Sequence, residues 1–102
     1  MIIQMKAENL KLTDEIKDYA QTKMGALTKY LGGIQVIDAR VKLALTSNHH
    51  QKGDIYECKA VLTLPKETLI VTKVEPDIFK AIDKVRGHLE RSIEKYKETH
   101  NT

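Results

Sequence analysis

The side chains best spaced to do chemistry are basic, and they lie between residues 80 and 95. Five of them share one side of a predicted helix: Lys80, Lys84, His88, Arg91 and Lys95. At about 100° per residue they fall within an arc of about 80°, along roughly 20 Å of helix. Such a strip is suited to a phosphate backbone. The alternative is a solvated helix face whose charges only add solubility, and the pattern alone leaves both interpretations open.

One lysine stands among the apolar positions of another predicted helix. Lys23 indexes between Tyr19, Leu27 and Tyr30, on the side expected to face the sheet or the neighbouring helix. We expect Lys23 to emerge in a groove between the helices, where the five basic residues would continue the lining. The alternative is a lysine with a buried apolar stem and an ammonium group that reaches water.

A smaller and more ambiguous basic pair, Arg40 and Lys42, is expected on the opposite face of the sheet. Few exposed aromatic residues accompany these charges. The sequence therefore favours recognition of shape and phosphate over stacking on bases.

Residues that would support catalysis or metal binding are sparse. The sequence has no Gly-rich phosphate loop and no GxSxG, HExxH or CxxC motif. Cys58 falls on the apolar register of a predicted strand, which favours a buried structural thiol. His49 and His50 are adjacent on a polar loop, where neighbouring side chains point apart and chelate poorly. We predict no enzymatic activity, no metal site and no cofactor.

Length and composition limit the class of protein to which the chain can belong. With 102 residues, 41% hydrophobic, the chain is predicted to form one domain over residues 1–102 rather than a disordered segment. It has no apolar run near the roughly 20 residues that span a bilayer, and its N-terminus does not resemble a secretory signal. A single cysteine and a net charge of +3 fit a soluble cytoplasmic protein without a membrane partner.

Hydrophobic spacing predicts the elements that position these side chains. Period-2 alternation predicts strands over residues 2–8, 37–45, 56–64 and 68–74. Helical spacing predicts one helix from Thr13 to a stop at Gly32-Gly33, and a second from Glu75-Pro76-Asp77 to about Glu98, with residues 98–102 frayed. The short turn at 65–67 predicts a hairpin. The order β-α-β-β-β-α implies an α+β sandwich: a four-stranded sheet with both helices on one face.

Two stretches of the sequence resemble the ribosome hibernation-promoting factor family, which includes the ribosome-associated inhibitor, also called subunit-interface or sigma-54 modulation protein. The first stretch carries Asn9-Leu10-Lys11-Leu12-Thr13, Tyr19, Lys23-Met24, Leu27 and Lys29-Tyr30. In the second, residues 77–83 stand where the family has DMYAAID, and residues 89–95 stand where it usually reads close to LxRQLxK. The resemblance covers the whole chain in the same order of elements.

The resemblance implies a fold similar to a double-stranded-RNA-binding domain and a non-enzymatic function. The implied function is binding to 16S rRNA in the small ribosomal subunit, in the channel used by mRNA and tRNA, which would block translation in stationary phase or stress and preserve idle ribosomes. The family's basic contacts carry over to Lys23, Arg91 and Lys95, whereas Lys80 and Lys84 fit the strip by geometry.

The sequence also departs from the family pattern. His88 stands where a lysine is usual, and we expect it to be partly charged near neutral pH. Ala26 and Ser92 replace a common lysine and a glutamine, and Gly25 weakens the first helix. Because the chain ends at Thr102, we expect a short-form factor that acts on single ribosomes or with a separate ribosome-dimerising protein. The competing hypothesis is a generic RNA- or protein-binding regulatory module, such as a transcription modulator.

Overall fold

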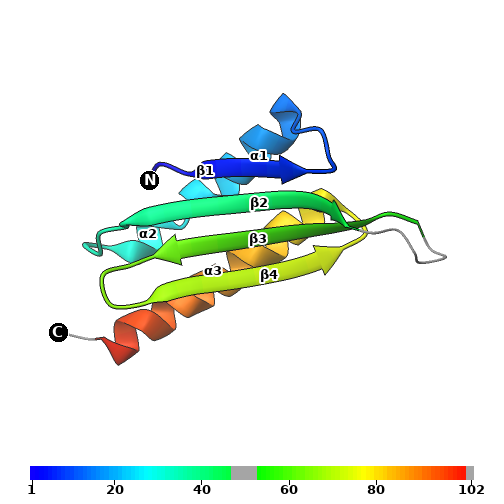
Figure 1. Cartoon of the computed structure of the whole chain (residues 1–102). Helices are drawn as coiled ribbons and strands as arrows, with labels where there is room; N and C mark the ends of the chain where they lie inside the picture. The colour runs from blue at the N-terminus through cyan, green and yellow to red at the C-terminus, as the bar shows by residue number, and fades with distance from the viewer. Residues whose placement is uncertain (47–52, 101–102) are drawn as a thin grey trace.

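A four-stranded sheet with helices on one of its faces is formed by residues 1–46 and 53–100, the part of the chain that the computed structural model describes (Figure 1). The elements follow in the order β1 (Gln4–Glu8), α1 (Asp14–Gly25), α2 (Thr28–Leu31), β2 (Asp38–Thr46), β3 (Ile55–Thr63), β4 (Thr68–Glu75) and α3 (Ile78–Thr99). The α+β fold predicted from the sequence is confirmed.

The strands are arranged in chain order across the sheet. β1 pairs in parallel with β2, and the crossover between them contains α1 and α2. β2 with β3 and β3 with β4 are antiparallel pairs. The predicted hairpin between the last two strands is confirmed, and its turn is closed by a 2.9 Å hydrogen bond from Leu64 N to Glu67 O.

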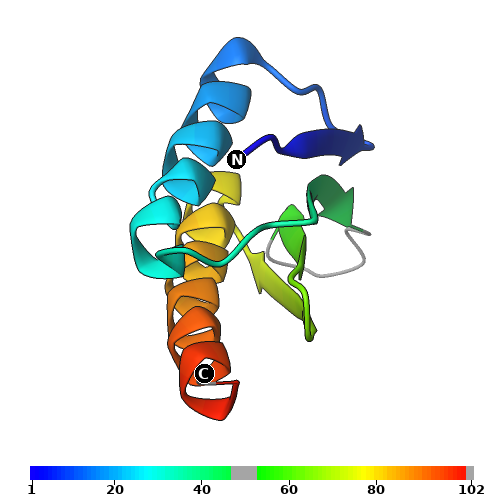
Figure 2. The same ribbon diagram turned by 90° about the vertical axis from the view of Figure 1, so that its left-hand side faces the viewer.

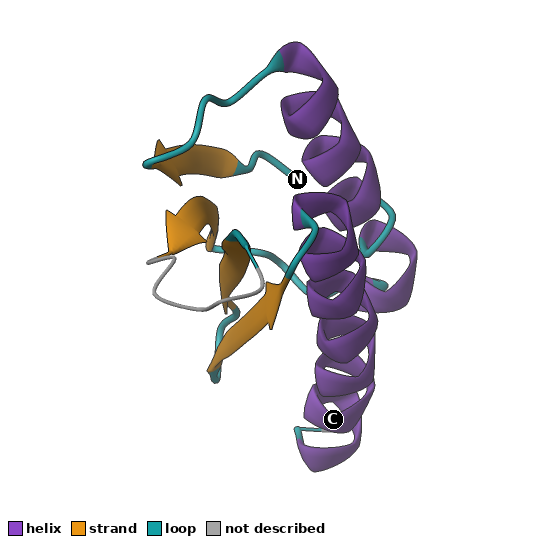
Figure 3. Ribbon diagram, turned by 90° about the vertical axis from the view of Figure 1, so that its right-hand side faces the viewer, coloured by secondary structure: helices purple, strands orange, loops and turns teal. Residues whose placement is uncertain are grey.

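Only one face of the sheet is covered, as the two side views show (Figures 2 and 3). Alternate strand residues point toward the helices and are buried, among them Val41, Leu43, Cys58, Ala60 and Leu62. They pack against one stripe of α3, formed by Ile82, Val85, Leu89 and Ile93. The apolar residues that repeat every 2.0 positions in the strands and every 3.6 positions in α3 therefore form one core. The described residues leave the other face of the sheet open.

The first predicted helix is divided in two. α1 ends at Gly25 and α2 begins at Thr28, because the hydroxyl of Thr28 bonds to the carbonyl oxygen of Gly25. The turn between them tightens: Leu27 N donates to Met24 O at 3.1 Å. A side chain thus takes the acceptor that a continuous helix would offer to a backbone N–H. The predicted stop at Gly32 is confirmed, since it is the C-cap with φ +60°.

Two other predicted boundaries differ from the structure. Ile37 precedes β2 and its side chain is 60% exposed, although its N–H bonds to Thr63 O. Pro76 precedes α3 rather than forming its first turn, because the Asp77 side chain accepts from Phe79 N at 2.8 Å and caps the helix there.

The C-terminal tail is ordered further along the chain than expected. Helix α3 continues to Thr99, and the N–H of His100 donates to Tyr96 O at 2.8 Å. The His100 ring also lies 3.0 Å from Glu67 Oε1 in the β3–β4 turn. These contacts hold residues 98–100 in place, so fraying does not begin at residue 98. Within the described part of the chain, no helix has the length and apolar character needed to cross a membrane.

Candidate nucleic-acid interface

Helix α3 presents four of its predicted basic residues to solvent. Lys80, Lys84, Arg91 and Lys95 are exposed, whereas the apolar stripe on the other side of the helix is buried against the sheet. We call the predicted set of Lys80, Lys84, His88, Arg91 and Lys95 the α3 strip. The shared face that sequence spacing predicted is thus present in the structure.

Members of the α3 strip differ in how far their charge is already neutralised. Lys84 Nζ lies 2.7 Å from Glu75 Oε2 at the end of β4, so this lysine is held in an ion pair. Lys80, Arg91 and Lys95 have no carboxylate within 4.0 Å among residues 1–46 and 53–100. These three cations are the ones that an external phosphate would meet without a competitor inside the chain.

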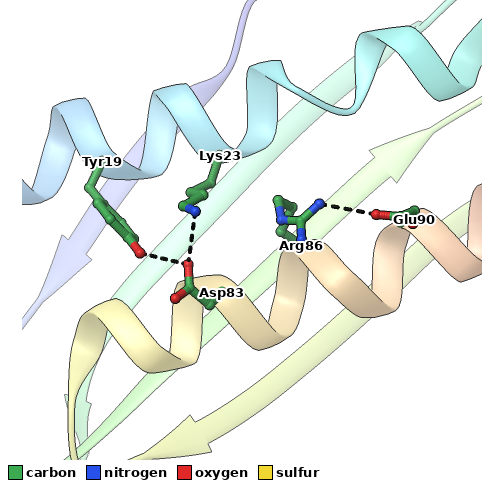
Figure 4. A network of polar contacts seen from close by, with 5 residues as sticks. All are labelled: Tyr19, Lys23, Asp83, Arg86 and Glu90. Atoms are coloured by element: carbon green, nitrogen blue, oxygen red, sulfur yellow. Dashed lines mark hydrogen bonds and ion pairs between the residues drawn. The ribbon is translucent and has the colours of Figure 1, made fainter.

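Lys23 lies between α1 and α3, as predicted, but it faces an acid. Its Nζ is 3.6 Å from Asp83 Oδ1 and 5.3 Å from the ring centroid of Tyr19 (Figure 4). Tyr19 also donates a 2.7 Å hydrogen bond to the same carboxylate oxygen. The Lys23 ammonium group therefore contacts Tyr19 on α1 and Asp83 on α3, and about one-third of the Lys23 side chain is exposed.

Carboxylates separate Lys23 from the α3 strip. At about 100° per residue, Asp83, Glu90 and Glu94 share the side of α3 that faces α1. Asp83 pairs with Lys23, whereas Lys84 of the strip reaches toward β4 and pairs with Glu75. Arg86, which the sequence analysis did not single out, pairs with Glu90 at 3.0 Å on the same acidic side (Figure 4).

His88 contributes less charge than the sequence suggested. Its Nδ1 is buried and has no hydrogen-bond partner among the described residues. Burial lowers the pKa of His88 below 6.5, and the positive charges of Lys73 on β4 and Arg91 on α3 lower it further. Both effects reduce the charged fraction of His88 near neutral pH in the free protein.

Arg40 and Lys42 lie on β2 with their side chains on the open face of the sheet, as predicted. Arg40 Nε is 2.6 Å from Asp38 Oδ2, and Lys42 Nζ is 3.2 Å from Glu57 Oε1. The hydrogen bond to Glu57 raises the pKa of Lys42 above its usual value. The sheet register also brings Lys6 and Lys59 beside Lys42, a neighbourhood that the spacing within any one strand does not reveal.

Of the residues considered for catalysis or metal binding, Cys58 is the one that lies in the described part of the chain. Cys58 is fully buried, and desolvation raises the pKa of its thiol to about 12, so it is neither accessible nor ionised. No group of three or more His, Cys, Asp or Glu residues suited to a metal ion occurs in the part of the chain that the structure describes. His49 and His50 lie outside the described residues.

Comparison with known proteins identifies the family. A family model described as sigma 54 modulation protein / S30EA ribosomal protein matches residues 3–101. The chain belongs to this family. The resemblance seen in the two sequence stretches is thereby confirmed.

Curated relatives of this S30EA family member include two proteins named ribosome hibernation promotion factor. The protein from Staphylococcus aureus (strain COL) is 30% identical over 94 residues, which are 92% of this chain and 47% of the relative. The protein from Lactococcus lactis subsp. cremoris (strain MG1363) is 33% identical over 95 residues, or 91% of this chain and 48% of the relative. The chain thus spans about half the length of these relatives.

Solved structures from the same comparison agree with the S30EA fold. The Thermus thermophilus Protein Y N-terminal domain has a TM-score of 0.79 at 26% identity, covering 94% of this chain and 99% of that chain. A ribosomal subunit interface protein from Coxiella burnetii has a TM-score of 0.74 at 19% identity, covering 96% and 99%. The second likeness bears on the fold alone.

Proposed function

We propose that this S30EA family member binds the small ribosomal subunit and inhibits translation by occupying the channel used by mRNA and tRNA. The binding would be to 16S rRNA phosphates, in stationary phase or stress, and it would preserve idle ribosomes. The protein would act in the cytoplasm as a binding factor without catalysis.

Family membership and the names of the relatives support the ribosome as the partner. Two relatives are named for ribosome hibernation, and the family model is described as a sigma 54 modulation protein / S30EA ribosomal protein. The buried, protonated state of Cys58 removes the best nucleophile of the described residues, which agrees with a factor that acts by binding.

The observation that carries the proposal is a set of three cations on one exposed face of α3 that have no carboxylate partner among the described residues. Lys80 and Lys95 are fifteen residues apart, or about 22 Å of helix, and Arg91 lies between them. Cations spread over this length meet several phosphates along an RNA backbone rather than a single small anion. Each phosphate that is neutralised releases counterions, and this supplies binding free energy that depends on salt.

Inhibition follows from occupation of space. The helices and the sheet share one core of buried apolar residues, so the domain is a rigid body rather than a flexible tail. A rigid domain held against rRNA by electrostatic contacts excludes any other ligand from the same channel. No chemical step is required.

The test is sedimentation with purified ribosomes and separated subunits at low and moderate salt. Wild type should pellet with the small subunit, and the variant Lys80→Glu/Arg91→Glu/Lys95→Glu should stay in the supernatant. The matched control is Lys11→Glu/Lys17→Glu/Lys66→Glu, which makes the same change of net charge at exposed lysines that do not belong to the α3 strip. Circular dichroism checks that all three proteins are folded.

Three outcomes would contradict this proposal. If wild type pellets with neither the ribosomes nor the small subunit, the partner is wrong. If free duplex RNA competes as well as small subunits do, the chain is a generic RNA-binding module, the competing hypothesis. Equal loss of binding in the control variant would show that only net charge matters and would remove the α3 strip as the binding face.

Salt dependence gives a second, quantitative test of the α3 strip. Replacing Lys80, Arg91 and Lys95 by Gln should reduce the magnitude of the slope of log K against log salt by about 2–3, at roughly 0.7–0.9 per lost phosphate contact. An unchanged slope would show that these cations do not touch phosphate.

A further inference from the structure

Three lysines form a row across the open face of the sheet. In the strand register, Lys6 on β1 pairs with Lys42 on β2, and Lys42 pairs with Lys59 on β3. Successive side chains point to opposite faces of a strand. Because Val41 and Cys58 point into the core, the lysines point away from the helices. We call Lys6, Lys42 and Lys59 the lysine row.

The lysine row places three like charges side by side, and nearby carboxylates compensate two of them in the free protein. Neighbouring strands lie about 4.8 Å apart, and like charges directly opposite each other destabilise a sheet. Glu57 lies 3.2 Å from Lys42, and Glu8 lies 3.9 Å from Lys6, so relief comes from one carboxylate each. In the described ranges, Lys59 has no carboxylate within 4.0 Å. An anion bound over the row would relieve this repulsion.

The lysine row borders a shallow depression with a volume of about 340 Å³. Arg40 adds a fourth cation to its lining, and the amide of Gln4 adds a polar group. Asp38 pairs with Arg40 at 2.6 Å, but the lining itself contains no carboxylate residue. The depression therefore offers an anion four cationic side chains. Arg40, Lys42 and Lys6 each already contact one acid, and Lys59 has no acidic partner in the described chain.

This surface and the α3 strip lie on opposite faces of a thin domain. The sheet forms one layer and the helices form the other, as both side views show (Figures 2 and 3). The shortest principal extent of the chain is 16 Å. Two RNA segments on either side of the domain can therefore be contacted at once.

We propose that the open face of the sheet is a second RNA-backbone surface, on which Lys6, Lys42, Lys59 and Arg40 contact phosphates while α3 contacts a separate RNA segment. The partner rests on the function proposed above, whereas the site is a separate claim. Because no aromatic residue lines the depression, contact is with phosphate rather than with stacked bases. A domain held on two faces would resist displacement better than one held on α3 alone.

The experiment compares small-subunit binding of Lys6→Gln/Lys42→Gln/Lys59→Gln with wild type over a series of KCl concentrations. The control Lys11→Gln/Lys17→Gln/Lys66→Gln removes the same charge from exposed sites outside both surfaces. We expect the row variant to bind about tenfold more weakly at low salt, with a slope reduced in magnitude by about 2, and the control to match wild type. The single variant Lys59→Gln should show about a third of the change in slope that the row variant shows.

Thermal unfolding separates lost contacts from lost folding. Removing like charges from adjacent strands should leave the melting temperature at low salt unchanged or raise it. Weaker binding by a variant that melts no earlier than wild type supports the proposal. If the row variant melts at a lower temperature than wild type, the binding of Lys59→Gln alone decides whether the row contacts RNA. This substitution removes a lysine with no acidic partner in the described chain.

Each other outcome identifies what has failed. If the row variant and the control bind alike while the α3 variant is defective, the second surface is overturned and the proposed function stands. If wild type fails to bind small subunits, both proposals fall. If wild type floats with anionic phospholipid vesicles, the row variant does not, and their subunit binding is equal, the open face is a lipid-binding surface and the RNA assignment is wrong.

Discussion

The phenol of Tyr19 on α1 donates a 2.7 Å hydrogen bond to Asp83 Oδ1 on α3. This hydrogen bond raises the pKa of Tyr19, so the phenol remains a donor through the neutral range. The same carboxylate lies 3.6 Å from Lys23 Nζ. Asp83 thus links the two helices and at the same time neutralises a lysine that the family resemblance assigns to rRNA binding.

Replacing Asp83 by Asn should therefore strengthen RNA binding while weakening the fold. Lys23 would lose its internal partner and the face would lose a negative charge, so we expect small-subunit affinity to rise a few-fold at low salt. Stability should fall by about 1 kcal/mol or less, because this contact is exposed and screened. Tyr19→Phe is the control: it removes the hydrogen bond but no charge, and its affinity should match wild type. Equal affinities in all three proteins would show that Lys23 does not contact phosphate.

The partly desolvated ring of His88 should make the fold less stable in mild acid. Its pKa is about 6.5 when unfolded and lower when folded, so the unfolded chain takes up a proton first as pH falls. Stability contributed by neutral His88 is fully present above pH 6.5 and is lost as pH drops from 6.5 toward the folded pKa. Urea unfolding between pH 7 and pH 5 should show this decline, and His88→Gln should reduce it. A variant that declines as steeply as wild type would assign the effect to other groups.

Cys58 should be inert in the native protein. A thiol with a pKa of about 12 is ionised about a thousandfold less at pH 8 than an unfolded thiol with a pKa near 8.5, and its burial blocks access as well. Reaction with a thiol reagent such as DTNB should be negligible in buffer. It should be rapid in about 6 M guanidinium, which unfolds the domain completely. Fast modification of the folded chain would contradict the buried position in β3.

Gly87→Ala should stabilise the protein by about 0.5–1 kcal/mol, because alanine has the higher helix propensity in the middle of α3. There is room for the added methyl group: its nearest neighbour would be Arg91 Nη1, 3.8 Å away. Gly32→Ala is the contrasting change and should destabilise, since Gly32 has φ +60°. Thermal or urea unfolding measures both. A destabilised Gly87→Ala would show that the Arg91 side chain needs the space over this glycine.

The local sequence pattern was sufficient to predict which face of each strand or helix is buried in the core. Val41 and Leu43 on β2, and Val85 and Leu89 on α3, are buried because the period of each pattern matches the geometry of its element. The cationic face of α3 follows from the same arithmetic, since a helix that buries one stripe must expose the opposite one. Family motifs then identified the family, and the family model agrees.

Contacts between different helices and strands could not be predicted from the spacing of residues within one element. The division of the first helix depends on the Thr28 hydroxyl taking the carbonyl oxygen of Gly25, a competition that periodicity does not register. Lys84 is held by Glu75 and Lys23 by Asp83 only because β4 and α1 dock on different sides of α3. These pairings decide which cations are available to a phosphate, and they arise from packing between segments that are distant in sequence.

The lysine row illustrates the same division most clearly. The sequence places each lysine on a strand and fixes its face by alternation, because the period of a strand is two residues. That Lys6, Lys42 and Lys59 stand side by side follows from the register of a parallel pair and an antiparallel pair. Register is set by backbone hydrogen bonds and by burial of the whole inner face, so the charge of this surface is a property of the assembled sheet.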